Sequence, residues 1–313
     1  MIKRYYIAVL LLLCVVTGCI KEDTADCPPP HNTVLKFTYS HAGTQANFTD
    51  YIGKVDVLIF DTSNELVLHQ MCDLDFLKAR AELLLTLPEG IYRVVCIGNL
   101  YGKSILRDRN STLTFTSGEI ITNDPSSGDP LYYAPAQSIT KAGQLIASEF
   151  TRADDIYTLV VPSRGSVERE FDFMRIHRSV KVYVSGLSAG QQSPPPLIKI
   201  NDLPIEYTMT LFGTPGKRDY ISQTTPVTTD GKAMLQSSFY SPYYDITDEY
   251  YITLTSGVTG ENLCSPINLK AYLDSNPAAD TDDIEMLIEF KDGSVTVTLP
   301  GWGAIPVDPV GNK

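Results

Sequence analysis

The sequence is short of basic residues, with 25 Lys and Arg against 37 Asp and Glu and a formal net charge of −12. Nucleic-acid-binding surfaces need clustered positive charge, so this balance argues against a nucleic-acid partner. Histidine and tryptophan are also scarce, at four and one. No histidine pair has metal-ligand spacing, and no phosphate-binding or dinucleotide-binding fingerprint occurs in strand context. We therefore expect neither a metal nor a cofactor.

Long helical periodicity is missing, and so is any regular alternation of strands with helices. Short runs instead alternate apolar and polar side chains, as from Ser179 to Ser185 and from Ile284 to Phe290. Asp292-Gly293 follows the second run and predicts a hairpin. The apolar run from Val55 to Phe60 predicts a central strand. The fold class expected from these patterns is all-β.

Only one long apolar run is present, from Ile7 to Val16, and it follows Lys3 and Arg4. It is too short to span a bilayer of about 30 Å. Because the run ends in Thr17-Gly18-Cys19, it predicts a lipoprotein signal peptide over residues 1–18, with Cys19 as the lipidated first residue. Acyl chains such as palmitate contribute roughly 0.8 kcal/mol per buried CH₂ to membrane binding. An ordinary signal peptide and a short membrane anchor are the alternatives.

Residues 19–32 predict a tether between the lipid and the folded region. Lys21, Glu22 and Asp23 are similar to the export signal of surface lipoproteins in Bacteroidetes, which favours the outer face of the outer membrane. The alternative is a solvated polar segment with charges there by composition. The prolines at 28–30 predict a stiff, extended spacer. Removal of the signal peptide leaves a formal charge of about −14.

The mature chain of roughly 295 residues exceeds what one hydrophobic core usually organises, which predicts two domains. The strand pattern stops after Pro162 and begins again beyond Ser163–Ser166. We therefore expect an N-terminal β-sandwich over 33–162, a hinge at the start of the second half, and a C-terminal β-sandwich over 163–313.

Four cysteines follow the predicted lipid site, namely Cys27, Cys72, Cys96 and Cys264. In an oxidising, exported setting they allow two disulfides in three connectivities, among which the sequence does not choose. Cys96 lies in an apolar run, so a buried free thiol is the alternative.

Residues 186–190 match the G-x-S-x-G pattern of a catalytic serine, here Ser188. A working nucleophile elbow needs a helix next, and Pro194–Pro196 cannot supply one. We therefore expect no catalytic Ser188. No other motif predicts catalysis, so the chain is not expected to be an enzyme.

Charged and aromatic clusters have structural alternatives. Asp280, Asp282, Asp283 and Glu285 lack the spacing of an EF-hand and predict a solvated turn. His177, between two arginines, predicts a solvated basic edge. Aromatic residues gather from Phe239 to Tyr251, where Tyr243 and Tyr244 would suit stacking on sugars, although a structural role is favoured.

Several segments, taken in order, resemble the FimB-type fimbrial anchor lipoprotein family of Bacteroidales, whose members are minor fimbrial subunits. The resemblance spans nearly the whole mature chain. It rests on Cys19, Asp26-Cys27-Pro28, Val34–Tyr39, Val55–Asp61, Gly90–Val95, Val180–Leu187 and Val297–Trp302.

The resemblance implies two transthyretin-like Greek-key β-sandwich domains in series and an outer-membrane lipid anchor. It also implies a role as base or minor subunit of a fimbria used in adhesion, with other fimbrial subunits as partners and no enzymatic activity. Such subunits assemble by β-strand addition, and the hypothesis is that the N-terminal domain accepts a strand. Loss of the strand Val34–Tyr39 would free the chain from its lipid. A surface glycan-binding lipoprotein is the alternative function.

Overall fold

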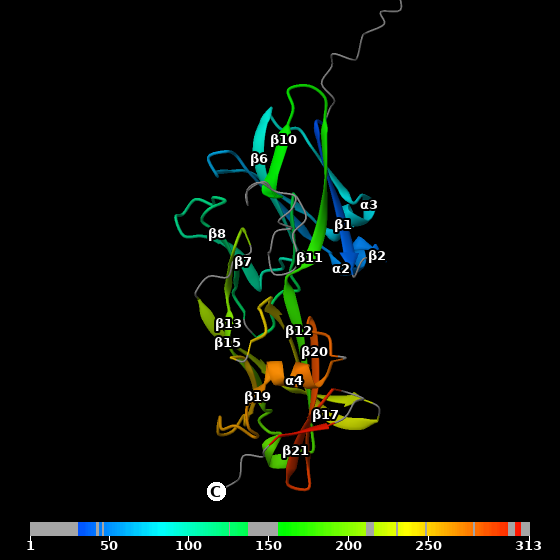
Figure 1. The fold of residues 1–313 in the computed structure, drawn as a ribbon, viewed down its shortest axis with the longest axis vertical. Helices are drawn as coiled ribbons and strands as arrows, with labels where there is room; N and C mark the ends of the chain where they lie inside the picture. Colours follow the sequence, from blue (N-terminus) through cyan, green and yellow to red (C-terminus); the bar gives the residue numbers. More distant parts are fainter. Residues whose placement is uncertain are drawn as a thin grey trace, which may run out of the picture.

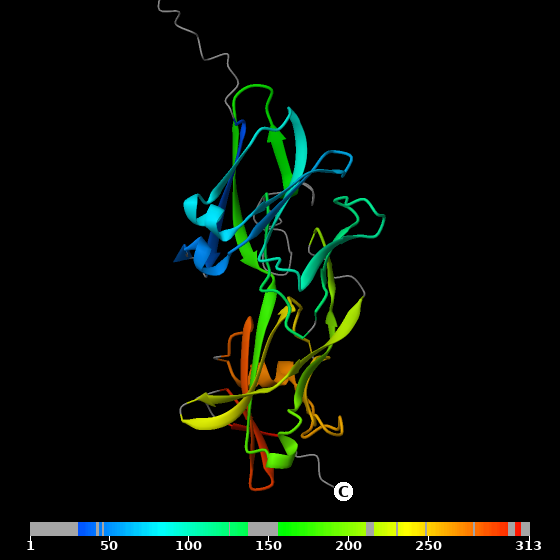
Figure 2. The ribbon, with the colours of Figure 1, turned by 180° about the vertical axis from the view of Figure 1, so that it is seen from behind.

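The computed structural model describes residues 31–41, 44–45, 47–124, 126–136, 156–210, 216–229, 231–247, 249–277, 279–299 and 304–307. Strands dominate this part of the chain and its helices are short, so the all-β prediction is confirmed. The molecule is elongated, with most strands of the first half toward one end and most strands of the second half toward the other (Figure 1). The view from behind shows the same arrangement (Figure 2).

A nine-stranded sheet organises the first half, and its main path has the order β2-β1-β11-β9-β6-β3-β4. Beside that path, β5 pairs with β1 and β10 pairs with β6. The pairing of β1 with β11 is parallel, whereas the other pairings in this sheet are antiparallel. The strands are β1 (Thr33–His41), β2 (Thr44–Gln45), β3 (Val55–Phe60), β4 (Leu66–Cys72), β5 (Glu82–Leu85), β6 (Gly90–Gly98), β9 (Tyr132–Pro135), β10 (Thr158–Val161) and β11 (Val167–Arg175).

β3 is a central strand, as predicted, because β4 and β6 pair with its two edges and both of its faces are buried. Val55, Val57 and Ile59 pack into the core on one face of the sheet. Leu58 and Phe60 pack into a second core on the other face. A strand covered on both sides reads as a nearly continuous apolar run, which is why the sequence indicated its place.

Two further sheets enclose the core of the second half. Their orders are β16-β17-β12-β20-β21-β22 and β15-β13-β18-β19. The strands are β12 (His177–Ser185), β13 (Leu197–Pro204), β15 (Lys217–Gln223), β16 (Thr225–Thr229), β17 (Lys232–Pro242), β18 (Tyr251–Thr255), β19 (Ile267–Asn268), β20 (Asp283–Lys291), β21 (Ser294–Thr298) and β22 (Ala304–Val307).

A three-stranded sheet of order β14-β8-β7 connects the two halves. β7 (Ser104–Asp108) and β8 (Gly118–Thr122) precede the predicted boundary, whereas β14 (Glu206–Thr208) follows it. Tyr207 and Met209 are buried in the same core as Leu58 and Phe60 of β3. The two halves therefore share a sheet and an apolar core.

Strand pairing in the first sheet continues across the predicted boundary between 162 and 163. β10 and β11 lie on either side of that position, and both pair with strands of the first sheet. Residues 167–175 are therefore part of the first sheet. The turn at Ser163–Ser166 returns the chain to the same sheet, and its sequence resembles that of an interdomain hinge because both need polar and glycine residues.

Short helices and turns complete the fold. The predicted Asp292-Gly293 hairpin joins β20 to β21, and both turn residues have positive φ, at 51° and 77°. Asp73 caps one helix by accepting a hydrogen bond from the Phe76 amide at 2.9 Å. The helices are α2 (Phe48–Tyr51), α3 (Leu74–Ala79), α4 (Leu269–Ser275) and the 3₁₀ helix η4 (Ala189–Gln191).

Candidate functional site

The predicted lipidation site Cys19 and the predicted export signal, Lys21, Glu22 and Asp23, lie outside the described residues. β1 begins at Thr33 and is the first described strand after the predicted tether. The candidate site within the described residues therefore consists of β1, the strands that hold it, and the junction between the two halves.

β1 is held on both edges over its first residues. Residues 33–36 pair with β5, and residues 33–39 pair in parallel with β11. Leu35, Phe37 and Tyr39 are buried in the core of the first half. Full burial of such side chains contributes roughly 1.5–3 kcal/mol each, so β1 is an integral core strand.

A row of polar contacts joins β1 to β11 on the outward side of the sheet. The contacts connect Lys36 Nζ with Glu168 Oε1 at 2.5 Å, Thr38 Oγ1 with Glu170 Oε1 at 3.0 Å, and Ser40 N with Asp172 Oδ1 at 2.9 Å. The hydrogen bond that Lys36 donates to Glu168 raises the pKa of Lys36, and burial raises the pKa of Asp172. These contacts reinforce the backbone ladder along the parallel pair.

The two halves are connected through a nearly continuous extended segment. β11 ends at Arg175, β12 begins at His177, and the single residue between them, Ile176, is buried. The Ile176 amide donates a hydrogen bond to the Leu131 carbonyl at 3.1 Å. Figure 1 shows β11 and β12 in green, following one another from one half into the other.

His177 lies at the centre of this junction and is only 3% exposed, which corrects the prediction of a solvated basic edge. Its ring lies edge to face with Tyr132 and Tyr240, at centroid distances of 5.3 and 5.2 Å. Nδ1 is 2.8 Å from the Leu131 carbonyl, and Arg175 Nε is 3.0 Å from Nε2. Burial, followed by the charge of Arg175, lowers the pKa of His177 to about 4. The imidazole is therefore neutral at pH 7, donating from Nδ1 and accepting at Nε2.

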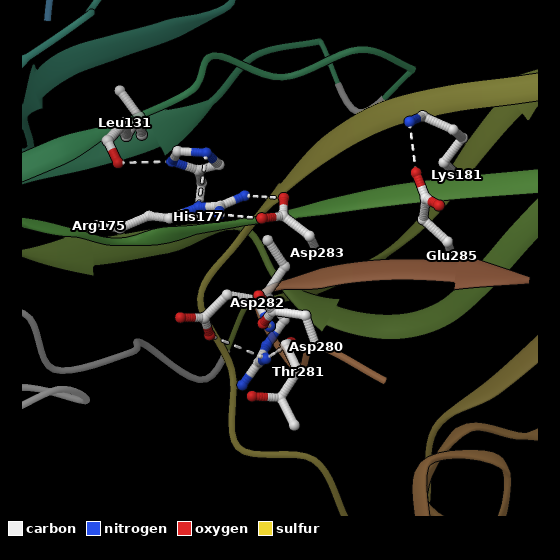
Figure 3. A network of polar contacts seen from close by, with 10 residues as sticks. Leu131, Arg175, His177, Lys181, Asp280, Thr281, Asp282, Asp283 and Glu285 are labelled. Carbon is white, nitrogen blue, oxygen red and sulfur yellow. Dashed lines mark hydrogen bonds and ion pairs between the residues drawn. The ribbon is translucent and has the colours of Figure 1, made fainter. Parts of the chain in front are cut away.

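The prediction of a solvated acidic turn is corrected for Asp283 and Glu285, which form ion pairs, whereas Asp280 is exposed. Arg175 binds Asp283 with two hydrogen bonds, Nη1 to Oδ2 at 2.7 Å and Nη2 to Oδ1 at 2.6 Å (Figure 3). Lys181 Nζ is 2.5 Å from Glu285 Oε1 on the neighbouring parallel strand. The hydrogen bonds from Arg175 lower the pKa of Asp283. These acids are thus ion-pair partners of β11 and β12.

Arg178 is a buried cation directly after His177. Its Nε and Nη2 donate to the Tyr244 carbonyl at 3.2 and 2.9 Å, and its Nη1 donates to the Thr281 carbonyl. Asp282 Oδ1 is 3.4 Å from Nη1. The guanidinium carbon lies 4.3 Å from the Tyr243 ring centroid, a cation–π contact. Arg178 therefore ties β12 to two loops of the second half.

A second ion-pair network reinforces the three-stranded sheet between the halves. Arg107 Nη2 contacts Glu119 and Glu206 at 3.2 and 2.8 Å, and Arg109 Nη2 contacts the same two acids at 2.7 and 2.9 Å. Glu119 and Glu206 are buried on neighbouring strands from different halves of the chain. The arginines therefore neutralise two carboxylates that would otherwise repel each other.

The tyrosines considered for sugar stacking form part of this packing. Tyr244 is buried and pairs with Tyr250 at a centroid distance of 4.9 Å. Tyr243 covers the guanidinium of Arg178. The structural role that the sequence favoured is the one these rings have.

Ser188 stands before the short helix η4, and its Oγ donates to Gln191 Oε1 at 2.8 Å. This is a capping arrangement, and the helix of a nucleophile elbow does not follow it. Among the described residues, no group of three His, Cys, Asp or Glu side chains is placed to hold a metal ion. In the same residues, no helix has the length and apolar character needed to cross a membrane.

Three of the predicted disulfide candidates, Cys72, Cys96 and Cys264, are buried free thiols. Burial raises the pKa of Cys72 and of Cys264 to about 11, and it raises that of Cys96 as well. The buried-thiol alternative given for Cys96 therefore holds, and the structure extends it to Cys72 and Cys264. Cys27 lies outside the described residues.

β4 forms one outer edge of the nine-stranded sheet, and in the described residues only β3 pairs with it. Its seven residues include no Lys, Arg, Asp, Glu or Pro. Val67 and Met71 are 48% and 53% exposed. Natural edge strands are usually protected by charges, prolines or bulges, and β4 has only a register shift near its start. Within the described residues, β3 is thus the one strand that pairs with β4.

Residues 23–308 match the model of the fimbrillin-A associated anchor proteins Mfa1 and Mfa2. The chain belongs to this family. The predicted membership in a fimbrial anchor family is thus confirmed, and with it a fimbrial subunit at the cell surface. No curated protein sequence matches the chain.

Solved structures share the fold of this anchor-family chain at low sequence identity. An adhesin candidate from Bacteroides ovatus is 12% identical with a TM-score of 0.65, covering 90% of this chain and 96% of its own. The fimbrial anchor protein Mfa2 from Porphyromonas gingivalis is 13% identical with a TM-score of 0.57, covering 88% and 99%. A candidate polysaccharide-binding protein from Bacteroides thetaiotaomicron is 13% identical with a TM-score of 0.59, covering 90% and 99%.

Proposed function

We propose that the protein is the outer-membrane anchor, or minor subunit, of a fimbria that supports adhesion, and that it holds other fimbrial subunits to the membrane. Membership of the fimbrial anchor family carries the proposal. No catalytic step is part of this role. Lys21, Glu22 and Asp23 would direct the lipoprotein to the outer face.

The attachment to the membrane is assigned to acyl chains on Cys19. Several chains on one residue give stable anchoring, since each buried CH₂ contributes roughly 0.8 kcal/mol. In the sequence, only residues 20–32 separate Cys19 from β1, whose side chains are part of the core. Cleavage beyond β1 would therefore cost both the lipid and a core strand, so an anchor has to keep its N-terminus intact.

The test replaces Cys19 in cells that make the fimbria. Cys19→Ala is expected to move fimbriae from the cell fraction to the medium, and Cys27→Ala in the same tether is the matched control. Mature protein recovered from wild-type fimbriae should carry a lipidated Cys19 at its N-terminus. An N-terminus beyond Tyr39, or fimbriae that stay on cells of the Cys19→Ala strain, would contradict the anchor role.

Other subunits are proposed to join by β-strand addition. β1 fills its own place between β5 and β11, so a donated strand cannot enter there while β1 remains. The outer edge of β4, which carries no Lys, Arg, Asp or Glu and has no second strand partner in the described residues, could accept a strand without that requirement. We assign the accepting edge of the N-terminal half to β4.

Photo-crosslinking tests this assignment on assembled fimbriae. A photoreactive residue at Val67 of β4 should capture a neighbouring fimbrial subunit, whereas one at Val160 of β10, which is 51% exposed, should not. Equal capture at both positions, or capture at 160 alone, would rule out β4. The anchor role stays independently testable through Cys19.

A glycan-binding role is the alternative, since one similar structure is that of a candidate polysaccharide-binding protein. The rings that suggested it, Tyr243 and Tyr244, contact Arg178, and Tyr244 is buried. Affinity gels containing common polysaccharides distinguish the two roles. Saturable retardation that is lost in Tyr243→Ala would support the alternative.

A further inference from the structure

We infer that the parallel pair β1 and β11 acts as a mechanical clamp, which resists a pull on the N-terminal tether by loading its hydrogen bonds in shear. The inference rests on the proposed anchor role only for the direction of the pull. The clamp itself is a property of the folded chain.

The direction of the strands produces this effect. Thr33 stands opposite Val167 and Tyr39 opposite Phe173, so both strands start at the same end of the sheet. A tether pulls β1 from its first residue. The chain beyond Arg175 pulls β11 from its last residue, because β12 continues in nearly the same line (Figures 1 and 2). The two forces are opposite and parallel to the strands, so the whole ladder has to slip at once.

Side chains strengthen the same pair on both faces. On the outward side, the row from Lys36, Thr38 and Ser40 reaches the acids of β11 at distances of 2.5–3.0 Å. On the inward side, Phe37 and Phe173 pack edge to face with ring centroids 6.1 Å apart. Slippage of β1 by one register position would break these contacts together and would turn apolar side chains toward water.

In the described residues, the chain passes from β11 into β12 without an intervening loop. Ile176 and His177 are buried, and Arg175 is bound to Asp283 of β20. β12 is central in its sheet and is paired with β17 and, again in parallel, with β20. Force that leaves the first half therefore enters the second through a strand that is fixed on both edges.

Single-molecule pulling tests the clamp because the direction of force can be chosen. The mature chain carries a coupling tag in place of the lipid, and Cys27→Ser leaves buried thiols as the remaining cysteines. In the shear geometry the second handle is Gly190→Cys, just beyond β12, where an added Cβ meets no atom within 4 Å. In the peeling geometry the second handle is Ser166→Cys, an exposed position directly before β11.

The two geometries stress the same strand pair differently. Pulling from the tag and Ser166→Cys separates the strands from one shared end, so the hydrogen bonds break one after another. Pulling from the tag and Gly190→Cys loads them together. Since forced unfolding is governed by the unfolding rate, the shear geometry should show a severalfold higher rupture force. Equal rupture forces in the two geometries would overturn the clamp.

A double variant isolates the contribution of the polar side chains that join β1 to β11. Lys36→Ala with Thr38→Ala should lower the rupture force in shear and leave the peeling force almost unchanged. Lys199→Ala, which removes a 3.1 Å ion pair with Asp219 away from this path, is the control. An equal loss of force from the control would assign the effect to general destabilisation and overturn the side-chain part of the clamp. These measurements use purified protein, so they fail or succeed independently of whether Cys19 anchors a fimbria.

Discussion

Arg175, the last residue of β11, and Asp283, the first residue of β20, form a two-point ion pair with N–O distances of 2.7 and 2.6 Å. The guanidinium thereby bridges the end of the first sheet and a central strand of the second. The same guanidinium donates through Nε to His177 at 3.0 Å. The Arg175 side chain thus holds both Asp283 and His177, the first residue of β12, at the junction between the two halves.

Loss of this pair should destabilise the chain measurably. We expect Asp283→Asn to lower the free energy of unfolding by about 1 kcal/mol, because the arginine is 13% exposed but the aspartate is 49% exposed and screened by solvent. Asp274→Asn, which removes the exposed i,i+4 pair with Lys270, should change it by less than about 0.5 kcal/mol. Urea unfolding of both variants checks the difference, and equal effects would contradict a role for the junction pair.

Protonation of His177 should make stability depend on pH. Its folded pKa is about 4 and its ordinary value is 6.5, so the unfolded chain binds the proton more readily. The contribution of the neutral imidazole is fully present above about pH 6.5 and is lost as the pH falls from there to about 4. Over this range the loss is on the order of 3 kcal/mol.

Urea unfolding at a series of pH values from 7.5 to 4 checks this dependence. His177→Gln cannot titrate, so its stability should fall less steeply between pH 6.5 and 4 than that of the wild type. Carboxylates contribute equally to both proteins. A wild-type slope that is unchanged in the variant would show that the imidazole does not produce it.

Local patterns predicted much of the fold, because alternation and continuous apolarity report which faces of a strand are buried. They indicated the central position of β3, the hairpin at Asp292-Gly293 and the inward residues of β12. These local patterns did not predict which strands pair with each other. The parallel pairing of β1 with β11 joins segments more than 130 residues apart, and nothing in either segment specifies the other.

The junction could not be recognised from sequence for a similar reason. Arg175, His177 and Arg178 look like a solvated basic run, because their burial depends on Tyr132, Tyr240 and distant acids. The available signal was a charged run inside a strand pattern together with an acidic run before another strand. Only the parallel register of β12 with β20 shows that the basic run and the acidic run lie next to each other.

The buried cysteines should be inert in the folded protein. Cys72, Cys96 and Cys264 are free and buried, and a pKa near 11 for Cys72 and for Cys264 leaves little thiolate at pH 8. In a Cys27→Ser chain without residues 1–19, a thiol reagent should therefore label none of them until denaturant is added, and then all three. Fewer than three thiols after unfolding without reductant would indicate a disulfide and contradict this assignment.

Two glycines of the G-x-S-x-G segment should respond differently to alanine. Gly186 has φ +77°, and an added Cβ would collide with the Phe290 carbonyl of β20. An added Cβ at Gly190 would instead meet open space.

The left-handed conformation of Gly186 alone costs roughly 1–3 kcal/mol for a residue with a side chain, and the collision adds to this cost because backbone has to move. Gly186→Ala should therefore lower the free energy of unfolding by more than about 2 kcal/mol, whereas Gly190→Ala should change it by less than about 1 kcal/mol. Urea unfolding of the two variants decides, and equal effects would mean that the close approach of β12 to β20 at Gly186 does not constrain this turn.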